Sequence, residues 1–210
     1  MANLCFTDIK IVDSEDNLEL IEKNILDATS SNPLGSDFGN DWLGNLLLHI
    51  GVPEDEVVHG NMRCRGIISC VDWCEKAGNK WINVFTETAW RPNVECVKKF
   101  AEHYSGTCKI TYAGDEGWNG LFWTNDPDML GKVLVDFEIG DSSVLPKWAR
   151  ELTSGEPMDI LECVDVMDTL LGEFDGNGFD DIALKACEAI EYPNYLSIHR
   201  YEFVPIGEET

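Results

Sequence analysis

The chain has 210 residues, of which 44% are hydrophobic, so it is long enough to bury a sizeable core and has a globular composition. Its 39 acidic residues outnumber 15 basic ones, giving a formal net charge of −24 at pH 7. Such a surface repels phosphate, which excludes direct binding to duplex nucleic acid or to an anionic membrane through a broad basic surface. The charge favours a basic protein partner.

The N-terminal segment predicts a strand followed by a helix. Residues 4–12, "LCFTDIKIV", alternate β-branched and aromatic residues with polar ones, which is typical of a strand. In residues 14–28 the apolar side chains recur on one helical face. An insertion at about 29–64 follows; it begins in a loop rich in Ser, Asn, Gly and Pro and includes a short helix at 41–50.

The middle of the chain predicts four further elements of the core. A strand at about 65–73 is followed by "WINVFTE", 81–87, whose two faces are both largely apolar; this predicts a central strand covered on both sides. Pro92 ends that strand and begins a helix that runs to about residue 105. Residues 107–113 and 121–125 predict a hairpin, and a further strand is expected at 132–139.

These elements predict an α+β fold. Their order is that of the ferredoxin-like split βαβ sheet, β-α-β-β-α-β, with helices on one face, and we assign it to residues 1–140. Residues 141–210 carry 16 acids and 4 bases. Amphipathic periodicity predicts that this part is an acidic, mostly helical extension packed on the core, with a final strand near its end.

Three segments follow a recognisable pattern. The start "MANLC" fits M-A-N-x-C, "GNKWINVFTETAWRPN" fits G-T-K-W followed by F-x-T-A-W-x-P-P, and "YAGDEGWNG" fits a turn of an acid, an aromatic residue and glycines; Trp73 lies at a compatible spacing. This combination, over residues 1–125, resembles the YubB-type ferredoxin-like family of plasmid, phage and other mobile-element proteins. Asn79 and Asn93 depart from the pattern. The resemblance implies a ferredoxin-like fold and a mobile-element setting, and no established activity.

Aromatic and charged residues are expected to share one end of the sheet. Tryptophans beside charged groups are suited to stacking on a base or holding a peptide side chain. The alternative is structural, with Trp90 packed back onto the following helix and Glu116 bracing the hairpin turn. The expected ligand or partner edge consists of Trp73, Trp81, Glu87, Trp90, Arg91, Asp115, Glu116 and Trp118.

A second candidate surface is acidic. Carboxylates spaced three residues apart on a helix repeat at about 4.5 Å, because each residue rises ~1.5 Å. A row of them imitates the charge of nucleic acid and fits a basic groove, whereas the simpler interpretation is solubility. The expected acidic partner face consists of Asp159, Glu162, Asp165, Asp168, Asp175, Asp180 and Asp181.

No metal, cofactor or catalytic site is expected. The eight cysteines include no Cys-x-x-Cys pair, which favours reduced, buried thiols in the cytoplasm over a zinc site. "EFDGNGFDD", 173–181, resembles a calcium loop, but Leu184 stands where the bidentate carboxylate is required. Glu87 with His103 is a weak acid–base pair. We expect neither a signal peptide nor a membrane-spanning segment.

The sequence therefore favours a non-enzymatic cytoplasmic interaction protein of a mobile genetic element, and leaves enzymatic activity open. One hypothesis is an acidic nucleic-acid mimic that binds a basic partner through its last third. The other is a small-ligand or single-strand binding module that uses the Trp-rich edge of the sheet.

Overall fold

The computed structural model describes residues 3–30, 38–60, 64–116, 121–138, 157–159, 163, 183 and 195–206. The chain divides into two compact units: Met1–Asp126 with Phe203–Thr210 form the first, and Pro127–Glu202 form the second. The elements of the chain are β1 (Leu4–Val12), α1 (Glu15–Thr29), α2 (Gly44–His49), α3 (Glu54–His59), β2 (Gly66–Lys76), β3 (Asn79–Ala89), α4 (Val94–Tyr104), β4 (Lys109–Glu116), β5 (Leu121–Thr124), a 3₁₀ turn (Pro127–Met129), β6 (Lys132–Glu138), β7 (Pro157–Asp159), β8 (Tyr195–Arg200) and β9 (Glu202–Phe203).

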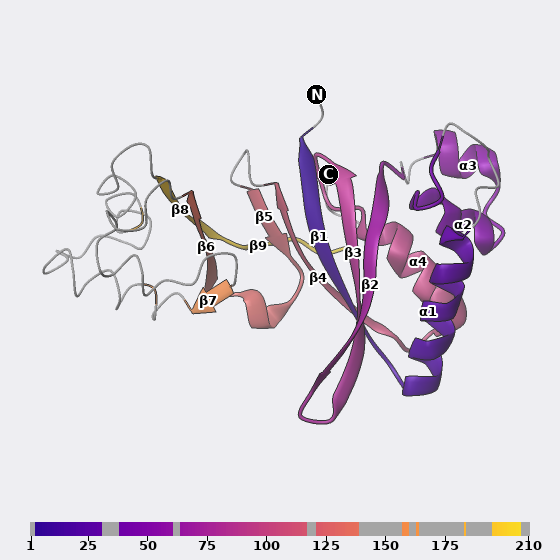
Figure 1. Cartoon of the computed structure of the whole chain (residues 1–210), viewed down its shortest axis with the longest axis horizontal. Helices are drawn as coiled ribbons and strands as arrows, with labels where there is room; N and C mark the ends of the chain where they lie inside the picture. The colour runs from indigo at the N-terminus through magenta and orange to yellow at the C-terminus, as the bar shows by residue number, and fades with distance from the viewer. Residues whose placement is uncertain are drawn as a thin grey trace, which may run out of the picture. The chain divides into compact units, whose positions relative to one another are not determined.

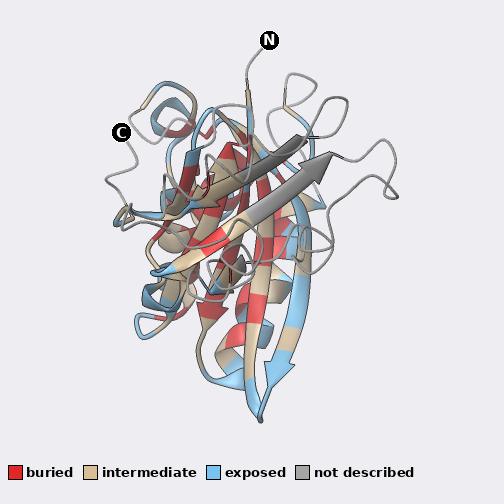
Figure 2. Cartoon of the chain, turned by 90° about the vertical axis from the view of Figure 1, so that its left-hand side faces the viewer, coloured by how far each residue is buried: buried red, intermediate tan, exposed pale blue. Residues whose placement is uncertain are grey.

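A six-stranded sheet organises the first unit, in the order β2-β3-β1-β4-β5-β9. β1 lies in its middle and pairs antiparallel with β3 and β4, so that Ile9 is opposite both Val84 and Tyr112. β2 and β3 form a long hairpin whose turn, Ala77–Gly78, has two residues with positive φ. Figure 2 shows that the turn end of this hairpin is exposed.

The core lies between this sheet and the helices, all of which cover the same face of β1–β4 (Figure 1). Alternate residues of β1 and β3 point into it, and Ile9, Ile11, Ile82 and Val84 are fully buried. They pack against one face of α1 and α4, where Phe100 is buried among the same cluster. Each such side chain contributes about 1.5–3 kcal/mol on burial, which fixes the register of the strands, because a slip by one residue would turn this set outward.

The insertion belongs to this core. Trp42, Leu43, Leu46, Leu47 and Val57 are all buried in the same cluster. The segment before α2 also covers the start of the edge strand β2, with Leu43 N–H donating to Gly66 O at 3.0 Å and Ile68 N–H donating to Asp41 O at 2.8 Å. Residues 38–60 therefore extend both the core and the sheet edge.

The second unit contains a three-stranded sheet in the order β7-β6-β8. Its strands are antiparallel: Val133 of β6 lies opposite Met158 of β7 and Arg200 of β8. Cys163 and Ala183 are buried and have helical backbone. β6 is thus grouped with the C-terminal residues by its hydrogen bonds, and the division of the chain falls after Asp126 rather than near residue 140.

The predicted fold class is wrong. The sheet of the first unit is not the four-stranded layout of a ferredoxin-like split βαβ fold, because β5 and β9 extend it beyond β4. The extension is not mostly helical in its described residues either, since β7, β8 and β9 are strands. The physical reason is strand pairing. β7 and β8 form hydrogen bonds with the two edges of β6, and β9 pairs with the free edge of β5.

A side chain of β4 helps to hold the segment that follows β9, beside the backbone bond from Val204 N–H to Thr124 O. Tyr112, buried on β4, donates its hydroxyl hydrogen to Val204 O at 2.8 Å. Tyr112→Phe keeps the ring and removes this donor, so we expect a loss of about 1 kcal/mol in the free energy of unfolding, measured by urea denaturation. Tyr104→Phe on α4 is the control, expected to change it by less than about 0.5 kcal/mol; equal losses would refute the role of the bond.

Candidate functional site

The sheet of the first unit has one face that none of the described helices covers. Each of its strands places every second side chain there, between the buried residues that form the core. We call this surface the open face. It is made by Phe6, Asp8 and Lys10 of β1, Trp81, Asn83, Phe85 and Glu87 of β3, and Thr111, Ala113 and Asp115 of β4.

The described helices therefore cover β3 on one side only. Ile82, Val84 and Thr86 are buried against the helices, whereas Trp81 and Phe85 are half-buried. Within the described residues no helix packs on the open face (Figure 1), so the expectation of a central strand covered on both sides is not met by that part of the chain. Apolar side chains on such a face are typical of an interaction surface.

A carboxylate and an amide form the polar centre of the open face. Asp8 lies opposite Phe85, and Asn83, opposite Lys10, donates from Nδ2 to Asp8 Oδ2 at 3.3 Å. The remaining oxygens, Asp8 Oδ1 and Asn83 Oδ1, are both buried and have no hydrogen-bond donor among the described residues. Burial raises the pKa of Asp8, and the charge of Lys10 opposes that shift. The centre thus contains two unsatisfied acceptors that lie just beneath the surface, and leaving them unpaired costs free energy.

Lys10 does not satisfy them. Its Nζ lies 4.6 Å from the centroid of the Trp81 ring, in a cation–π contact. Within the described residues, no ion pair joins Lys10 to Asp8. The indole therefore holds the ammonium group to one side of the polar centre.

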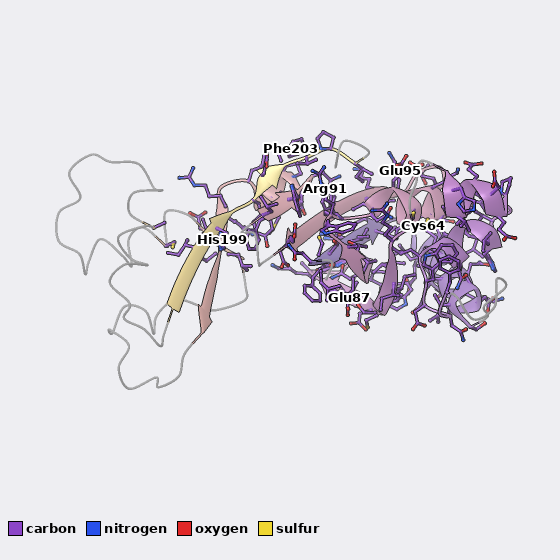
Figure 3. All side chains as sticks on the ribbon, turned by 90° about the horizontal axis from the view of Figure 1, so that it is seen from above. Cys64, Glu87, Arg91, Glu95, His199 and Phe203 are labelled. Atoms are coloured by element: carbon purple, nitrogen blue, oxygen red, sulfur yellow. The ribbon has the colours of Figure 1, made fainter. Side chains whose placement is uncertain are left out.

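Phe6 and two carboxylates form the other end of the open face. Phe6 is 49% exposed and lies opposite Glu87 of β3 and Asp115 of β4. Directly opposed side chains have Cβ atoms about 5 Å apart, so an exposed ring lies between two acidic side chains. Figure 3 shows Glu87 at the border of the first unit. Leu4, also on β1, is 47% exposed.

Trp90 is exposed rather than packed onto α4. It directly follows β3, is 47% exposed and has a φ of +67°, a left-handed conformation that a bulky residue rarely adopts. Its N–H donates to Asn3 O at 2.9 Å, and the guanidinium carbon of Arg65 lies 5.4 Å from the ring centroid. The structure therefore contradicts the inward-packed alternative. Arg91 is exposed beside it.

The other expected edge residues do not gather at that end of the sheet. Trp73 lies opposite Ile82, on the helix side of β2. Trp81 is separated from Trp90 by the length of β3, about 30 Å. Glu116 is 2% exposed, and Trp118 lies outside the described residues. The structure thus brings together Glu87 and Asp115 across Phe6, but it places Trp73 and Trp81 near the hairpin turn.

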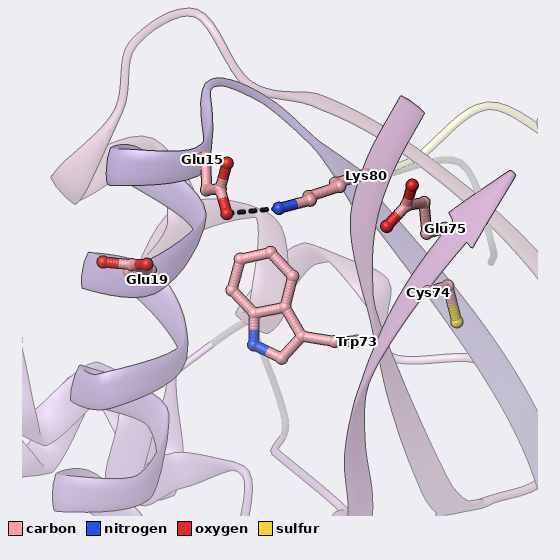
Figure 4. Close-up of a pocket in the computed structure, with 6 residues that line it drawn as sticks. All are labelled: Glu15, Glu19, Trp73, Cys74, Glu75 and Lys80. Atoms are coloured by element: carbon pink, nitrogen blue, oxygen red, sulfur yellow. Dashed lines mark hydrogen bonds and ion pairs between the residues drawn. The ribbon is translucent and has the colours of Figure 1, made fainter. Parts of the chain in front are cut away.

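Trp73 lines a pocket of about 350 Å³ between α1 and the hairpin (Figure 4). The pocket contains the ion pair between Lys80 Nζ and Glu15 Oε1, which raises the pKa of Lys80 through its hydrogen bond to Glu15. The other lining residues are Glu19, Cys74 and Glu75. A lysine of the chain already pairs with one of the carboxylates that line this pocket, so the pocket is the weaker candidate for a cationic ligand.

The expected acidic partner face falls mostly outside the described residues. Glu162, Asp165, Asp168, Asp175, Asp180 and Asp181 are in that part. Asp159 does not begin a helix as expected; it ends β7, opposite Lys132 of β6, because the preceding residues pair with that strand.

Comparison with family models, with curated proteins and with solved structures finds no match to this chain. Within the described residues, no three His, Cys, Asp or Glu side chains form a group that could hold a metal ion. The helices of that part are all too short or too polar to cross a membrane.

Sequence reasoning missed the polar centre. Asp8 and Lys10 occupy the polar positions of an alternating strand, where charged residues are ordinary. Pairing of this strand with "WINVFTE" places an amide beside the carboxylate. That pairing could have indicated the polar centre, but the residues that face each other across the two strands cannot be determined from the sequence alone.

Proposed function

We propose that this chain is a binding protein whose open face takes a basic protein partner, with an arginine side chain of the partner at Asp8 and Asn83. One observation carries the proposal: two buried acceptor oxygens without donors among the described residues lie on a sheet face with exposed aromatic side chains. A donor from a partner would remove the cost of leaving them unpaired.

Arginine fits this centre better than lysine does. Its planar guanidinium presents several N–H donors in a fixed fork, which matches two neighbouring acceptors, and it is less strongly hydrated than an ammonium group. Its flat faces also stack on aromatic rings, which Phe6 and Phe85 provide on the same strands. Bound arginine would neutralise Asp8, whose ionised form is disfavoured by burial.

Charge complementarity favours a basic protein over single-stranded nucleic acid. The net charge of −24 attracts a basic partner and increases its association rate at low salt. Glu87 and Asp115 add local negative charge beside Phe6. Aromatic platforms for single strands combine stacking with a positive groove, and the acidic residues beside Phe6 would instead repel phosphates.

The setting is part of the proposal. The resemblance to the YubB-type family supports a mobile-element protein. A mobile-element protein of this charge would act by occupying a basic protein of its host.

The test is a titration of the isotope-labelled chain with an arginine-rich peptide, followed by NMR. We expect amide and side-chain shifts at Asp8, Asn83 and Glu87, and weaker binding at 0.5 M salt, where the screening length falls well below ~8 Å. A lysine-rich peptide of equal length and charge should bind less tightly.

Two results would overturn the proposal. Shifts confined to residues 141–210 would assign binding to the acidic last third, as the nucleic-acid mimic hypothesis requires. Equal affinity for both peptides would show attraction by charge alone, without recognition at the polar centre.

A further inference from the structure

Two cysteines from distant parts of the chain meet in the first unit. Cys64 immediately precedes β2 and Cys96 lies in the first turns of α4, and their Sγ atoms are 3.0 Å apart. Cys64 is 6% exposed and Cys96 is fully buried. In Figure 3, Cys64 lies among the interior side chains, away from Glu87. A separation this short brings the two sulfur atoms within reach of bond formation with little movement of the backbone.

The surroundings make the two thiols unequal. The hydrogen bond from Cys96 lowers the pKa of Cys64, against the effect of its burial, and the positive charge of Lys99 lowers it further. The pKa of Cys96 is raised well above its ordinary value, first by that same hydrogen bond and then by burial. Asn93 Oδ1 lies 3.2 Å from Cys96 Sγ and is the alternative acceptor for the single hydrogen of the Cys96 thiol. Cys64 is therefore the sulfur that ionises first and attacks.

A cavity gives small molecules a route to Cys64. It measures about 350 Å³, and its lining includes Phe38, Trp42, His59, Cys64 and Arg65. Hydrogen peroxide is far smaller than this volume.

We propose that Cys64 and Cys96 are a redox pair that hydroperoxides oxidise reversibly to a disulfide. The Cys64 thiolate attacks one oxygen of hydrogen peroxide, the O–O bond breaks, and hydroxide leaves and is protonated to water, giving a sulfenic acid at Cys64. The Cys96 sulfur then attacks the Cys64 sulfur as its thiol proton leaves. The S–S bond forms, the S–O bond breaks, and a second water leaves. Two thiols lose two electrons and one peroxide gains them.

The bond would link the end of the insertion to α4. It closes a loop between residues 32 positions apart in the sequence, which restricts the unfolded chain. Oxidation should therefore stabilise the first unit, raising its melting temperature by roughly 5–15 °C. This inference is independent of the proposed binding at the open face.

The experiment treats the full chain with hydrogen peroxide and analyses it by mass spectrometry and thermal unfolding. We expect a mass loss of two hydrogen atoms, a cross-linked Cys64–Cys96 peptide after proteolysis, the higher melting temperature, and reversal of all three by dithiothreitol. Cys96→Ser should abolish the cross-link and the stabilisation. Cys70→Ser, which removes an exposed thiol of β2, should keep both.

The proposal fails if peroxide leaves Cys64 and Cys96 open to alkylation, or if it produces a sulfinic acid at Cys64 with Cys96 still a thiol. A cross-link that joins any other cysteines would also overturn it. The peptide map is measured on the wild-type chain. These outcomes therefore test the proposal even if Cys96→Ser is too unstable to be compared.

Discussion

Replacing Trp42 by alanine is expected to lower the free energy of unfolding by about 3–5 kcal/mol, the usual loss for a buried aromatic side chain. Trp42 is 6% exposed, stacks on Phe38 with ring centroids 4.1 Å apart, and donates from Nε1 to Cys64 O at 2.5 Å. Its ring packs directly over Gly44, where an added Cβ would lie 2.3 Å from the ring. The substitution leaves a cavity, and it leaves the Cys64 carbonyl without its donor.

The measurement is urea denaturation followed by far-ultraviolet circular dichroism. The matched control is Trp90→Ala, which removes the same side chain from an exposed position and is expected to cost less than about 1 kcal/mol. A small effect of Trp42→Ala would show that residues 38–60 are not part of the cooperative core. A large effect of Trp90→Ala would mean that its contact with Arg65 is structural.

Local pattern predicted most of the individual elements. The strand at 4–12 and the helix at Val94–Tyr104 are confirmed, because burial of one face imposes alternation on the strand and a repeat of three and four residues on the helix. Pro92 lies between β3, which ends at Ala89, and that helix, which begins at Val94, two residues later than predicted. These signals depend on residues close together in the chain, so they can be recognised from the sequence.

Long-range pairing was not predictable in the same way. In the β2–β3 turn Ala77 has a φ of 53°, which alanine adopts rarely. Because Ala-Gly stands where Asn-Gly or Asp-Gly is usual, the sequence gives no clear signal of a hairpin turn there. The pairing of β6 with β7 and β8 joins segments far apart in the chain, and short apolar runs there fit a helix or a strand equally well. The fold class was wrong for this reason.

The candidate site was predictable in part. Glu87 and Asp115 were expected to share an end of the sheet, and the register places both beside Phe6. Asp8 and Asn83 were not singled out, because their importance depends on which oxygen lacks a donor after folding. Only the structure contains that information.

The second large effect is expected from Asp8→Asn, which should weaken binding of the arginine-rich peptide by about 10- to 100-fold. A hydrogen bond to a charged group contributes about 1.5–3 kcal/mol, and the substitution replaces a charged acceptor by a neutral amide. Asp16→Asn on α1 is the matched control: it removes the same charge from an exposed position on the helix side of the sheet. It should weaken binding by less than about threefold.

The same substitution should stabilise the free protein at neutral pH, by about 1 kcal/mol, because the Nδ2 group of asparagine can donate to the unpaired Asn83 Oδ1. Burial raises the pKa of Asp8 in the folded state above its unfolded value, so ionisation destabilises the fold. The penalty is full above the folded pKa and is lost as pH falls toward the unfolded value of 3.8. The stability gained by Asp8→Asn should shrink over that window in urea denaturation at a series of pH values. An acceptor that is reserved for a ligand lowers stability when the ligand is absent. If Asp8→Asn binds weakly and is also less stable at pH 7, the role of Asp8 is to stabilise the fold and not to bind a partner.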